Sequence, residues 1–387
     1  MFKCQEGYTL RKIKGVSYIL PFGQQIADQR KGTILNETSA FLWNVIQHNE
    51  GADLEMLTEM LARRYGLEED FPMIREDILD FLRQLQSMGM LTETLRLQSE
   101  EASLCILIAG LRLRFHGASQ LFSGYFDKFR EMNPAKDADQ EIEFFTTPPA
   151  SKSYGKVLLR NSDMTIFENT DRYVILFPQM SNIHQVHMSL DGSYVRFYCT
   201  PETSESAQEN IFHAIRLFFL FVAQKHGKFA IHSASILYKE KAWLFSGHSG
   251  MGKSTHTQMW HDLLQTPYLN GDLNLLGMES GKIIVYGIPW CGTSGIYTTT
   301  DHELGGIVLL GRDPEKDFLQ ELSPSEKVIR IMQRMISPSW KERFFSMNLD
   351  FAEKIAGQVP ILHLLCTRNP SAVYTVQREI DTLEEPQ

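Results

Sequence analysis

One short run of residues, 247–254, constrains this chain more than any other feature of its sequence. It reads Gly247-His248-Ser249-Gly250-Met251-Gly252-Lys253-Ser254. The run fits the pattern G-x-x-x-x-G-K-[ST], in which backbone N–H groups turn inward around phosphate oxygens. The apolar run Ala242–Phe245 before it predicts a strand, and the residues after it predict a helix. This order is the context that a phosphate-binding loop requires, so the sequence predicts such a loop.

Each residue type in this loop has its own predicted role. Glycine leaves room where a Cβ atom would obstruct the backbone amides, and Lys253 supplies a compact positive charge along the phosphates. The Ser254 hydroxyl is a ligand for Mg²⁺, and the helix beginning near Lys253 turns its positive end toward the anion. We therefore expect ATP and Mg²⁺ as ligands, with nucleotide contacts from Gly247, Ser249, Gly250, Met251, Gly252, Lys253, Ser254 and Thr255.

A phosphate-binding loop of this kind also needs a carboxylate near the metal. Asp272, which follows the predicted strand Tyr268–Asn270, is the best placed. It would hold Mg²⁺ together with Ser254, or take the proton from an acceptor hydroxyl. The alternative interpretation is a turn aspartate beside Gly271. His232 lies among small and apolar residues, and by itself such a histidine is more often structural than catalytic.

Composition limits the partners and the compartment. At 387 residues the chain should form two or three units, and its formal net charge of −9 gives no field that recruits nucleic acid. Its five cysteines include no Cys-x-x-Cys pair, so neither a disulfide framework nor a zinc ribbon is indicated. The most apolar stretch, Leu217–Ala223, is far shorter than the roughly 20 residues of a membrane span. We expect a cytoplasmic protein without nucleic-acid or membrane partners, and its oligomeric state stays open.

Residues 1–95 are predicted to form a small winged-helix-like α+β module of three strands and three helices. Alternating residues predict strands at Tyr8–Lys14, Val16–Phe22 and Thr33–Leu35. The first helix should begin after Asn36, which is a good N-cap residue. The apolar spacing predicts two further helices, from Leu54 to Tyr65 and from Ile74 to Met88.

The remaining chain is expected to contain a linker at residues 96–102, a β-rich lobe at 103–227 and a catalytic domain at 228–387. The stretch Asn133–Lys156 has little order signal. In the last segment, turns at Lys239-Glu240-Lys241 and Glu279-Ser280-Gly281 predict β-hairpins. We therefore expect an α/β domain with a mixed sheet rather than strict βαβ alternation.

Several motifs together resemble the bacterial HPr kinase/phosphorylase group, and more closely its relatives that phosphorylate serine in ribosomally made peptides. They are the glycine loop, His232-Ser233-Ala234 before it, and Asp272 followed by Ile288-Pro289-Trp290. The resemblance covers roughly residues 103–380. It implies a PEP carboxykinase-like P-loop fold, whose sheet is mixed, and catalytic roles for His232, Asp272 and Lys253.

The chain departs from that group at two positions. Thr255 stands where HPr kinases have glutamate, which points away from HPr as the acceptor. Gly271-Asp272 stands where family members often have Asp-Asp. A single carboxylate is then left for metal or proton work, so reduced or lost activity is one expectation.

The first module resembles the PqqD-like peptide recognition domain. The likeness rests on Leu10-Arg11, Val16–Pro21, Leu35-Asn36, Ala40–Trp43 and Leu85–Leu91. It implies that the leader of a precursor peptide adds as a strand beside the third strand and packs on the third helix. The implied peptide-binding residues are Thr33, Ile34, Leu35, Ile78 and Phe81. The alternative, a winged helix that binds DNA, conflicts with the acidic second and third helices.

Together these features predict a peptide-tailoring kinase. The N-terminal module would hold a precursor peptide near the catalytic domain and so raise its effective concentration. The catalytic domain would transfer the γ-phosphoryl of ATP to a Ser or Thr hydroxyl. Two alternatives stay open, a non-catalytic nucleotide-gated chaperone that presents peptides to another enzyme, and an enzyme that removes phosphate by phosphorolysis.

Overall fold

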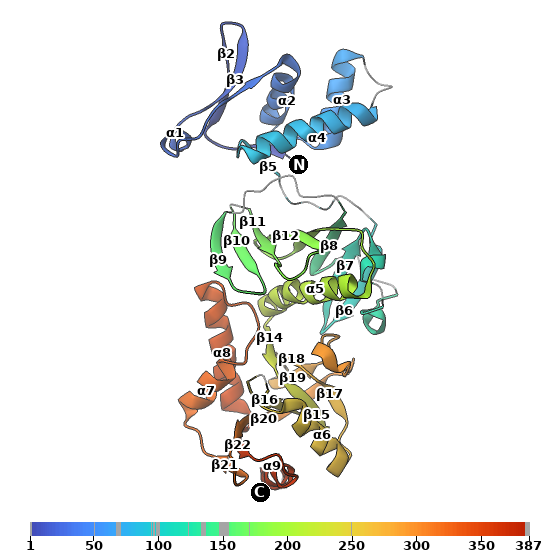
Figure 1. The fold of residues 1–387 in the computed structure, drawn as a ribbon, viewed down its shortest axis with the longest axis vertical. Helices are drawn as coiled ribbons and strands as arrows, with labels where there is room; N and C mark the ends of the chain where they lie inside the picture. The colour runs from blue at the N-terminus through green and yellow to red at the C-terminus, as the bar shows by residue number, and fades with distance from the viewer. Residues whose placement is uncertain are drawn as a thin grey trace. The chain divides into compact units, whose positions relative to one another are not determined.

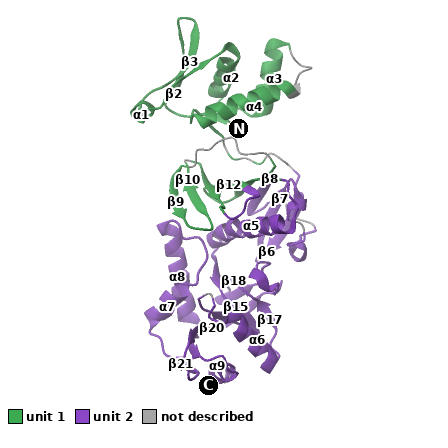
Figure 2. Cartoon of the chain, viewed as in Figure 1, with its two compact units in different colours: residues 1–98, 145–178, 184–200 green, residues 99–144, 179–183, 201–387 purple. Residues whose placement is uncertain are grey.

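The computed structural model describes residues 2–49, 51–66, 71–93, 95, 97, 101–122, 124–132, 137–146, 155–169, 171–248 and 250–383. The chain packs as two compact units (Figure 2). The first comprises residues 1–98, 145–178 and 184–200, and the second comprises 99–144, 179–183 and 201–387. The segment 103–227 thus contributes strands to both units, and the predicted domain boundaries at residues 95, 102 and 227 stay predictions.

The N-terminal module of the first unit has the predicted three strands followed by three helices (Figure 1). An antiparallel sheet of order β2-β3-β4 is formed by Tyr8–Ile13, Val16–Pro21 and Thr33–Leu35. The helices are α2 (Glu37–His48), α3 (Leu54–Tyr65) and α4 (Phe71–Ser87). Three short elements lie outside the prediction, namely β1 (Phe2–Cys4), α1 (Gln24–Ala27) and β5 (Leu91–Glu93).

Local chemistry explains where these helices start and end. The Asn36 side chain accepts the Ser39 N–H at 2.7 Å, and the Asp53 side chain accepts the Met56 N–H at 2.8 Å. Both are N-caps that satisfy amides left unpaired by the first turn. Gly66 ends α3 at φ +66°, where residues with a side chain are disfavoured. The apolar faces then meet in one core that includes Ile19, Trp43, Ile46, Leu57, Ile78 and Leu82.

The first unit also contains five neighbouring strands of a β-sheet, in the order β13-β12-β11-β10-β9. In chain order its strands are β9 (Lys156–Arg160), β10 (Thr165–Glu168), β11 (Arg172–Leu176), β12 (Ile183–Ser189) and β13 (Tyr194–Cys199). One face of these strands carries the buried polar side chains of Arg172, His187 and Arg196. Arg172 and His187 line a polar cavity.

The second unit begins with strands β6 (Leu104–Ile108), β7 (Leu111–His116) and β8 (Gln140–Phe145). Strand β8 lies within the stretch expected to be irregular, so that expectation was wrong there. Its acidic residues weakened the strand signal, but Glu141 is paired across the strands with Arg114 at 2.6 Å and with His116 at 2.7 Å. Short 3₁₀ turns follow β7 at Ser119–Leu121 and Asp127–Phe129.

A nine-stranded mixed sheet forms the centre of the second unit, as predicted. Its main path is β14-β18-β19-β20-β16-β15-β17, with β22 beside β20 and β21 beside β22. Strand β20 is parallel to β16 and β22, whereas β15 and β16 form an antiparallel hairpin. The strands are β14 (Lys228–His232), β15 (Ala234–Tyr238), β16 (Lys241–Ser246), β17 (Tyr268–Asn270), β18 (Leu273–Glu279), β19 (Lys282–Tyr286), β20 (His302–Arg312), β21 (Phe318–Gln320) and β22 (Ile361–Cys366).

Strand β20 is the longest of this sheet and was not predicted from the sequence. Two adjacent glycines, Gly305 and Gly306, interrupt its apolar pattern. They are needed for packing, because Cβ atoms there would lie 2.5 and 2.6 Å from the Trp243 ring. Glycine inside a strand often marks such a close approach.

Helices cover both faces of the sheet. Helices α7 (Pro324–Met332) and α8 (Glu342–Gln358) pack on one face in a core that includes Phe229, Ile307 and Phe351. Helices α6 (Lys253–Leu264) and α9 (Ser371–Leu383) pack in a second core that includes Trp243, Trp260 and Val376. Helix α5 (Glu205–Lys225) contacts β14. No helix in the described part of the chain is long and apolar enough to cross a membrane.

Candidate active site

The glycine loop joins β16 to α6, as the sequence predicts. Strand β16 ends at Ser246 and α6 begins at Lys253. Gly250 and Gly252 have φ angles of +76° and +96°, a region that residues with a side chain rarely adopt. A Cβ atom on Gly247 would lie 3.1 Å from the Met251 Cβ atom. Backbone conformation therefore favours glycine at 250 and 252, and close packing favours it at 247, while Ser249 lies outside the described residues.

Lys253, Ser254 and Thr255 form the first turn of α6. Ser254 and Thr255 are exposed, whereas Lys253 is half-buried. Burial lowers the pKa of Lys253, the Asp272 carboxylate opposes this shift, and the positive charge of Arg334 adds to it. These residues form the N-terminus of α6, so the positive end of the helix dipole lies beside their side chains.

His232 and Asp272, about 40 residues apart in the chain, meet beside this loop. His232 ends β14, which is antiparallel to β18, and Asp272 precedes the first residue of β18. The His232 Nδ1 atom is 3.6 Å from the Asp272 Oδ1 atom. The Ser233 N–H donates to the Asp272 carbonyl at 2.9 Å, which fixes the two backbones. Burial and the nearby Lys253 charge lower the pKa of His232, against the opposing effect of Asp272, which favours the neutral imidazole.

A buried asparagine holds the turn that carries Asp272. The Asn270 Oδ1 atom accepts the N–H groups of Asp272 and Leu273, both at 3.0 Å. Its Nδ2 atom donates to the Trp290 carbonyl at 3.0 Å. Asn274 supports the other side by donating to the Ser233 carbonyl at 2.7 Å. Sequence reasoning missed both asparagines, because Asn270 beside Gly271 reads as an ordinary turn residue and Asn274 lies between two leucines within a strand.

The position before Asp272 has no room for a side chain. A Cβ atom on Gly271 would lie 2.1 Å from the Ser294 Oγ atom. The Gly271 N–H donates to the Ile296 carbonyl at 3.1 Å, which holds the segment 291–296 against it. Gly292 in the same segment packs on Asp272, since its Cβ would lie 2.9 Å from the Asp272 Cβ atom. The short 3₁₀ turn Gly292–Ser294 thus occupies the space that a second carboxylate would need.

Two arginines that sequence reasoning did not assign to the site lie beside it, Arg312 and Arg334. The backbone carbonyl of Arg334 accepts the His232 N–H at 2.9 Å. The Arg334 side chain lies on the same side of the site, with its Nη1 atom 3.1 Å from the His248 Nδ1 atom. Arg334 also lowers the pKa of both His232 and Lys253, which places its charge close to them. Arg312 donates to the Gly250 carbonyl. These arginines belong to no motif, because their positions depend on the sheet order rather than on local spacing.

The oxygen donors suit a magnesium ion that is completed by phosphate. Within the described residues no three His, Cys, Asp or Glu side chains gather into a metal-binding group. Mg²⁺ does not need one, since it is commonly held by one or two carboxylates together with substrate phosphates and water. Asp272 and the Ser254 hydroxyl offer hard oxygen ligands of the right kind, and Ser254 as a ligand stays a prediction.

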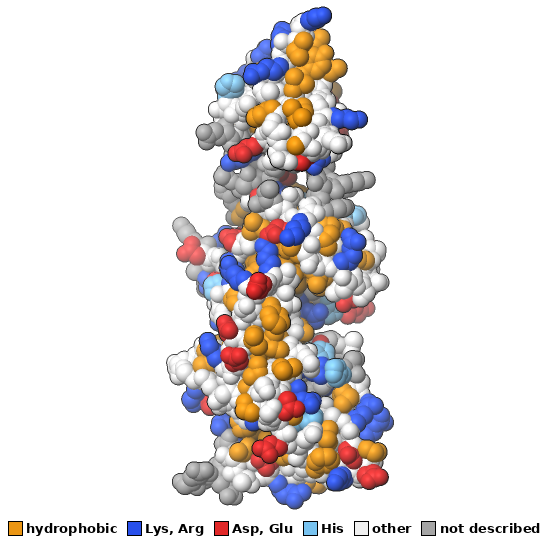
Figure 3. All heavy atoms as spheres, turned by 90° about the vertical axis from the view of Figure 1, so that its left-hand side faces the viewer, with side chains coloured by type: hydrophobic (Ala, Val, Ile, Leu, Met, Phe, Trp, Pro, Cys, Tyr) orange, Lys and Arg blue, Asp and Glu red, His pale blue; other side chains and the backbone are white. Residues whose placement is uncertain are grey.

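The predicted peptide-binding residues lie at the edge strand β4 and on α4. Ile34 is 65% exposed and Phe81 is half-buried, so both can touch a partner. The side chains of Leu35 and Ile78 are buried in the core, at 7% and 1% exposure, and direct side-chain contact does not fit them. Figure 3 shows apolar side chains gathered on this module, where the exposed ones include Ile13, Val16, Phe22, Ile26 and Ile34.

Comparisons with known proteins assign one part of the chain. The family model for coenzyme PQQ synthesis protein D (PqqD) matches residues 26–91, so a PqqD domain lies in the N-terminal module. A solved structure, the Hpr(Ser) kinase/phosphatase from Coxiella burnetii, is similar over 40% of this chain and 94% of its own, with 12% identity and a TM-score of 0.25. No curated protein matches the chain.

Proposed function

We propose that this chain is a peptide-tailoring kinase that transfers the γ-phosphoryl of ATP to a Ser or Thr hydroxyl of a precursor peptide. The observation that carries the proposal is the His232–Asp272 pair, 3.6 Å apart, beside the glycine loop with Lys253 at the start of α6. A carboxylate and a lysine beside an anion-binding loop are groups that phosphoryl transfer uses, and a neutral imidazole can assist the carboxylate.

The proposed reaction assigns a task to each group, and two tasks to Asp272. Asp272 accepts the proton of the acceptor hydroxyl, whose oxygen attacks the γ-phosphorus while the bond to the β-phosphate oxygen breaks and ADP leaves. Neutral His232 orients Asp272 and can pass the proton onward. Lys253, Arg334 and the loop amides stabilise the charge on the transferring group. Mg²⁺, when bound, would neutralise phosphate charge, with Ser254 and Asp272 as its protein ligands.

The PqqD domain supplies the peptide-binding half of the proposal. Domains of this family bind precursor peptides in the biosynthesis of ribosomally made, modified peptides. Strand β4 lies at the end of its sheet, next to β3 alone within that three-stranded sheet. An edge strand offers backbone groups to an added peptide strand, while exposed side chains such as Ile34 and Phe81 give selectivity. We place the leader on this edge.

A nucleotide-gated peptide chaperone is the second candidate. It is favoured by one observation, that the packing of Ser294 against Gly271 leaves Asp272 as the single carboxylate of this turn. Such a protein would bind the same leader and nucleotide, but no hydroxyl would be modified.

Mass spectrometry separates the two candidates. The protein is incubated with Mg-ATP and the short precursor peptide encoded beside its gene. One added phosphoryl group, absent with Asp272→Asn, is the result expected of a kinase. Tight leader binding with an unmodified core peptide favours the chaperone. Removal of phosphate from a phosphopeptide in the presence of inorganic phosphate would instead indicate phosphorolysis.

A further inference from the structure

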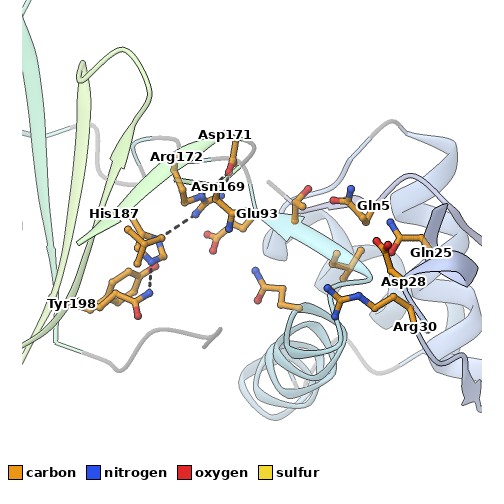
Figure 4. A pocket seen from close by; sticks show the side chains of 16 residues that line it. Gln5, Gln25, Asp28, Arg30, Glu93, Asn169, Asp171, Arg172, His187 and Tyr198 are labelled. Carbon is orange, nitrogen blue, oxygen red and sulfur yellow. Dashed lines mark hydrogen bonds and ion pairs between the residues drawn. The ribbon is translucent and has the colours of Figure 1, made fainter. Parts of the chain in front are cut away.

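The first unit contains a polar cavity of about 250 Å³ that the proposed function does not use (Figure 4). One wall comes from the N-terminal module and includes Gln25, Asp28, Arg30, Gln86 and Glu93. The facing wall comes from β11, β12 and β13 and includes Asp171, Arg172, Gln185, His187 and Tyr198. The volume lies below the range typical of pockets for drug-sized ligands, so it suits one or two side chains rather than a cofactor.

Most charged groups in this cavity already have partners. Asp171 binds the Arg172 guanidinium through both oxygens, at 2.9 and 2.7 Å, and Arg172 also lies 3.2 Å from the His187 Nδ1 atom. Glu93 pairs with Arg196 at 3.0 Å. Asp28 accepts a hydrogen bond from the Gln24 amide at 2.8 Å. Asp171 and Glu93 are therefore paired with buried arginines, whereas exposed Asp28 is hydrogen-bonded to a neutral amide.

Two groups of the lining remain to be satisfied. Gln86 is 7% exposed, and its Oε1 atom has no hydrogen-bond partner among the residues that the structure describes. A buried carbonyl of this kind costs stability unless a ligand or water donates to it. Arg30 is exposed, and no carboxylate of the described chain pairs with its guanidinium. The unmatched groups are thus one acceptor and one positive charge, which suit a backbone or side-chain N–H and a carboxylate.

The cavity adjoins the strand edge assigned to the leader. Arg30 precedes Thr33, the first residue of β4, by three residues, which span at most about 10 Å. The sheet β2-β3-β4 is antiparallel, and antiparallel pairing is also the commoner kind. A peptide strand added antiparallel to β4 runs toward Thr33, so its C-terminal end leaves beside Arg30.

We propose that this cavity holds the part of the precursor that follows the strand paired with β4, and that it selects an acidic side chain there. Arg30 binds the carboxylate, and Gln86 accepts a peptide N–H group. This inference rests on the proposed function, because it assumes that a peptide lies along β4. It adds a second recognition point on the C-terminal side of the leader.

A displayed library of random linear peptides tests the inference without knowledge of the precursor. The full-length protein and two charge-reversed variants, Arg30→Glu and Lys12→Glu, are used to enrich binders. Lys12 is exposed on β2 and lies near the β2–β3 turn, at the end of the sheet away from Arg30, so it serves as the matched control. The enriched sequences are then compared for an apolar alternating pattern and for charge at a fixed distance after it.

The outcomes separate the inference from the function on which it rests. We expect the wild type to enrich an apolar pattern followed by an acidic residue, Arg30→Glu to replace that residue by a basic one, and Lys12→Glu to leave it acidic. Two results would overturn the proposed site for an acidic side chain while leaving leader binding intact. The residue after the apolar pattern could carry no preferred charge, or its preferred charge could be the same with Arg30→Glu as with the wild type. If no apolar pattern is enriched, leader binding along β4 fails and the inference fails with it.

A second variant tests the buried acceptor. Gln86→Leu keeps a similar shape but cannot accept a hydrogen bond. It should weaken binding of a wild-type-selected peptide about tenfold, the effect of losing one good hydrogen bond. Fluorescence anisotropy measures the dissociation constant, and the melting temperature shows whether the variant is folded. Unchanged affinity in a folded variant removes Gln86 from the proposed site.

Discussion

The Ser294 Oγ atom lies where the side chain of residue 271 would begin, 2.1 Å from the ideal Cβ position of Gly271. Ser294 is itself fixed, because its hydroxyl donates to the Cys291 carbonyl at 2.6 Å and accepts the Ile296 N–H at 3.2 Å. Glycine at 271 is therefore part of the packing between two segments of the site. The single carboxylate of this turn therefore goes together with the close packing of the segment 291–296 on Gly271.

This packing predicts that a second carboxylate introduced at position 271 lowers both stability and activity. Gly271→Asp should lower the melting temperature, since forcing a side chain into a filled space typically costs about 1–3 kcal/mol. It should also lower peptide phosphorylation by displacing the segment 291–296. Ser294→Gly in the same chain should recover part of the melting temperature. A Gly271→Asp variant that is as stable as the wild type and more active would contradict this view of the loop.

Lys253 is predicted to be needed for nucleotide binding. Lys253→Met keeps much of the side-chain length and removes the charge, and it should weaken ATP binding by about tenfold or more, the effect of losing a charge-assisted interaction. Isothermal titration with ATP and Mg²⁺ measures the change. Lys354→Met, on the exposed side of α8, is the control and should bind ATP as the wild type does. Equal affinity in the two variants would remove Lys253 from the site.

Arg334 is predicted to act on the transfer step rather than on folding. Its carbonyl holds the His232 backbone and is unaffected by a side-chain change, so Arg334→Met should stay folded. Loss of a donor that stabilises the transition state lowers kcat by about 100- to 1,000-fold, with a smaller change in KM. Steady-state kinetics of peptide phosphorylation measure both constants, with Arg343→Met on α8 as the control. A change confined to KM would indicate that Arg334 only binds substrate.

His256 should make stability depend on pH. Its side chain is buried on α6 without a partner for either ring nitrogen in the described structure, and burial lowers its pKa from 6.5 to about 4, a shift that Asp317 opposes. Because the folded pKa is depressed, this contribution is fully present above pH 6.5 and is lost as pH falls toward 4. The shift corresponds to roughly 3 kcal/mol.

The matching experiment compares melting temperatures of variants at pH 7 and pH 4.5. His256→Leu should lose less stability on acidification than the wild type, because its side chain cannot bind a proton. His184→Gln, at an exposed position of β12, is the control and should follow the wild type. Equal acid sensitivity of His256→Leu and the wild type would show that His256 titrates normally in the folded protein.

Local patterns predicted the parts of the site that are continuous in sequence. The glycine loop, the start of α6 at Lys253 and the hairpin before the loop all follow from residue types within a few positions. The mixed sheet was also predicted from its hairpins and is confirmed. In the N-terminal module, Asn36 predicted the start of α2 by its capping chemistry.

The remaining parts depend on contacts between distant segments. Strand β20 was missed because Gly305 and Gly306, which break its apolar pattern, are explained only by the Trp243 ring that packs on them. Arg334 reaches His232 through a bridge between Ile231 and Met335 that no local spacing encodes. Similarly, the constraint on Gly271 becomes visible only once Ser294 is placed beside it.

The most direct test of the central claim follows the γ-phosphoryl group itself. ATP labelled at the γ-phosphate is incubated with Mg²⁺, the neighbouring-gene precursor peptide and either the wild type or Asp272→Asn, and the label on the peptide is measured. The account predicts that label moves to a Ser or Thr of the peptide with the wild type, and that Asp272→Asn, although it still binds ATP, transfers almost none. Label that remains on ATP with both proteins, while the leader is tightly bound, would contradict it.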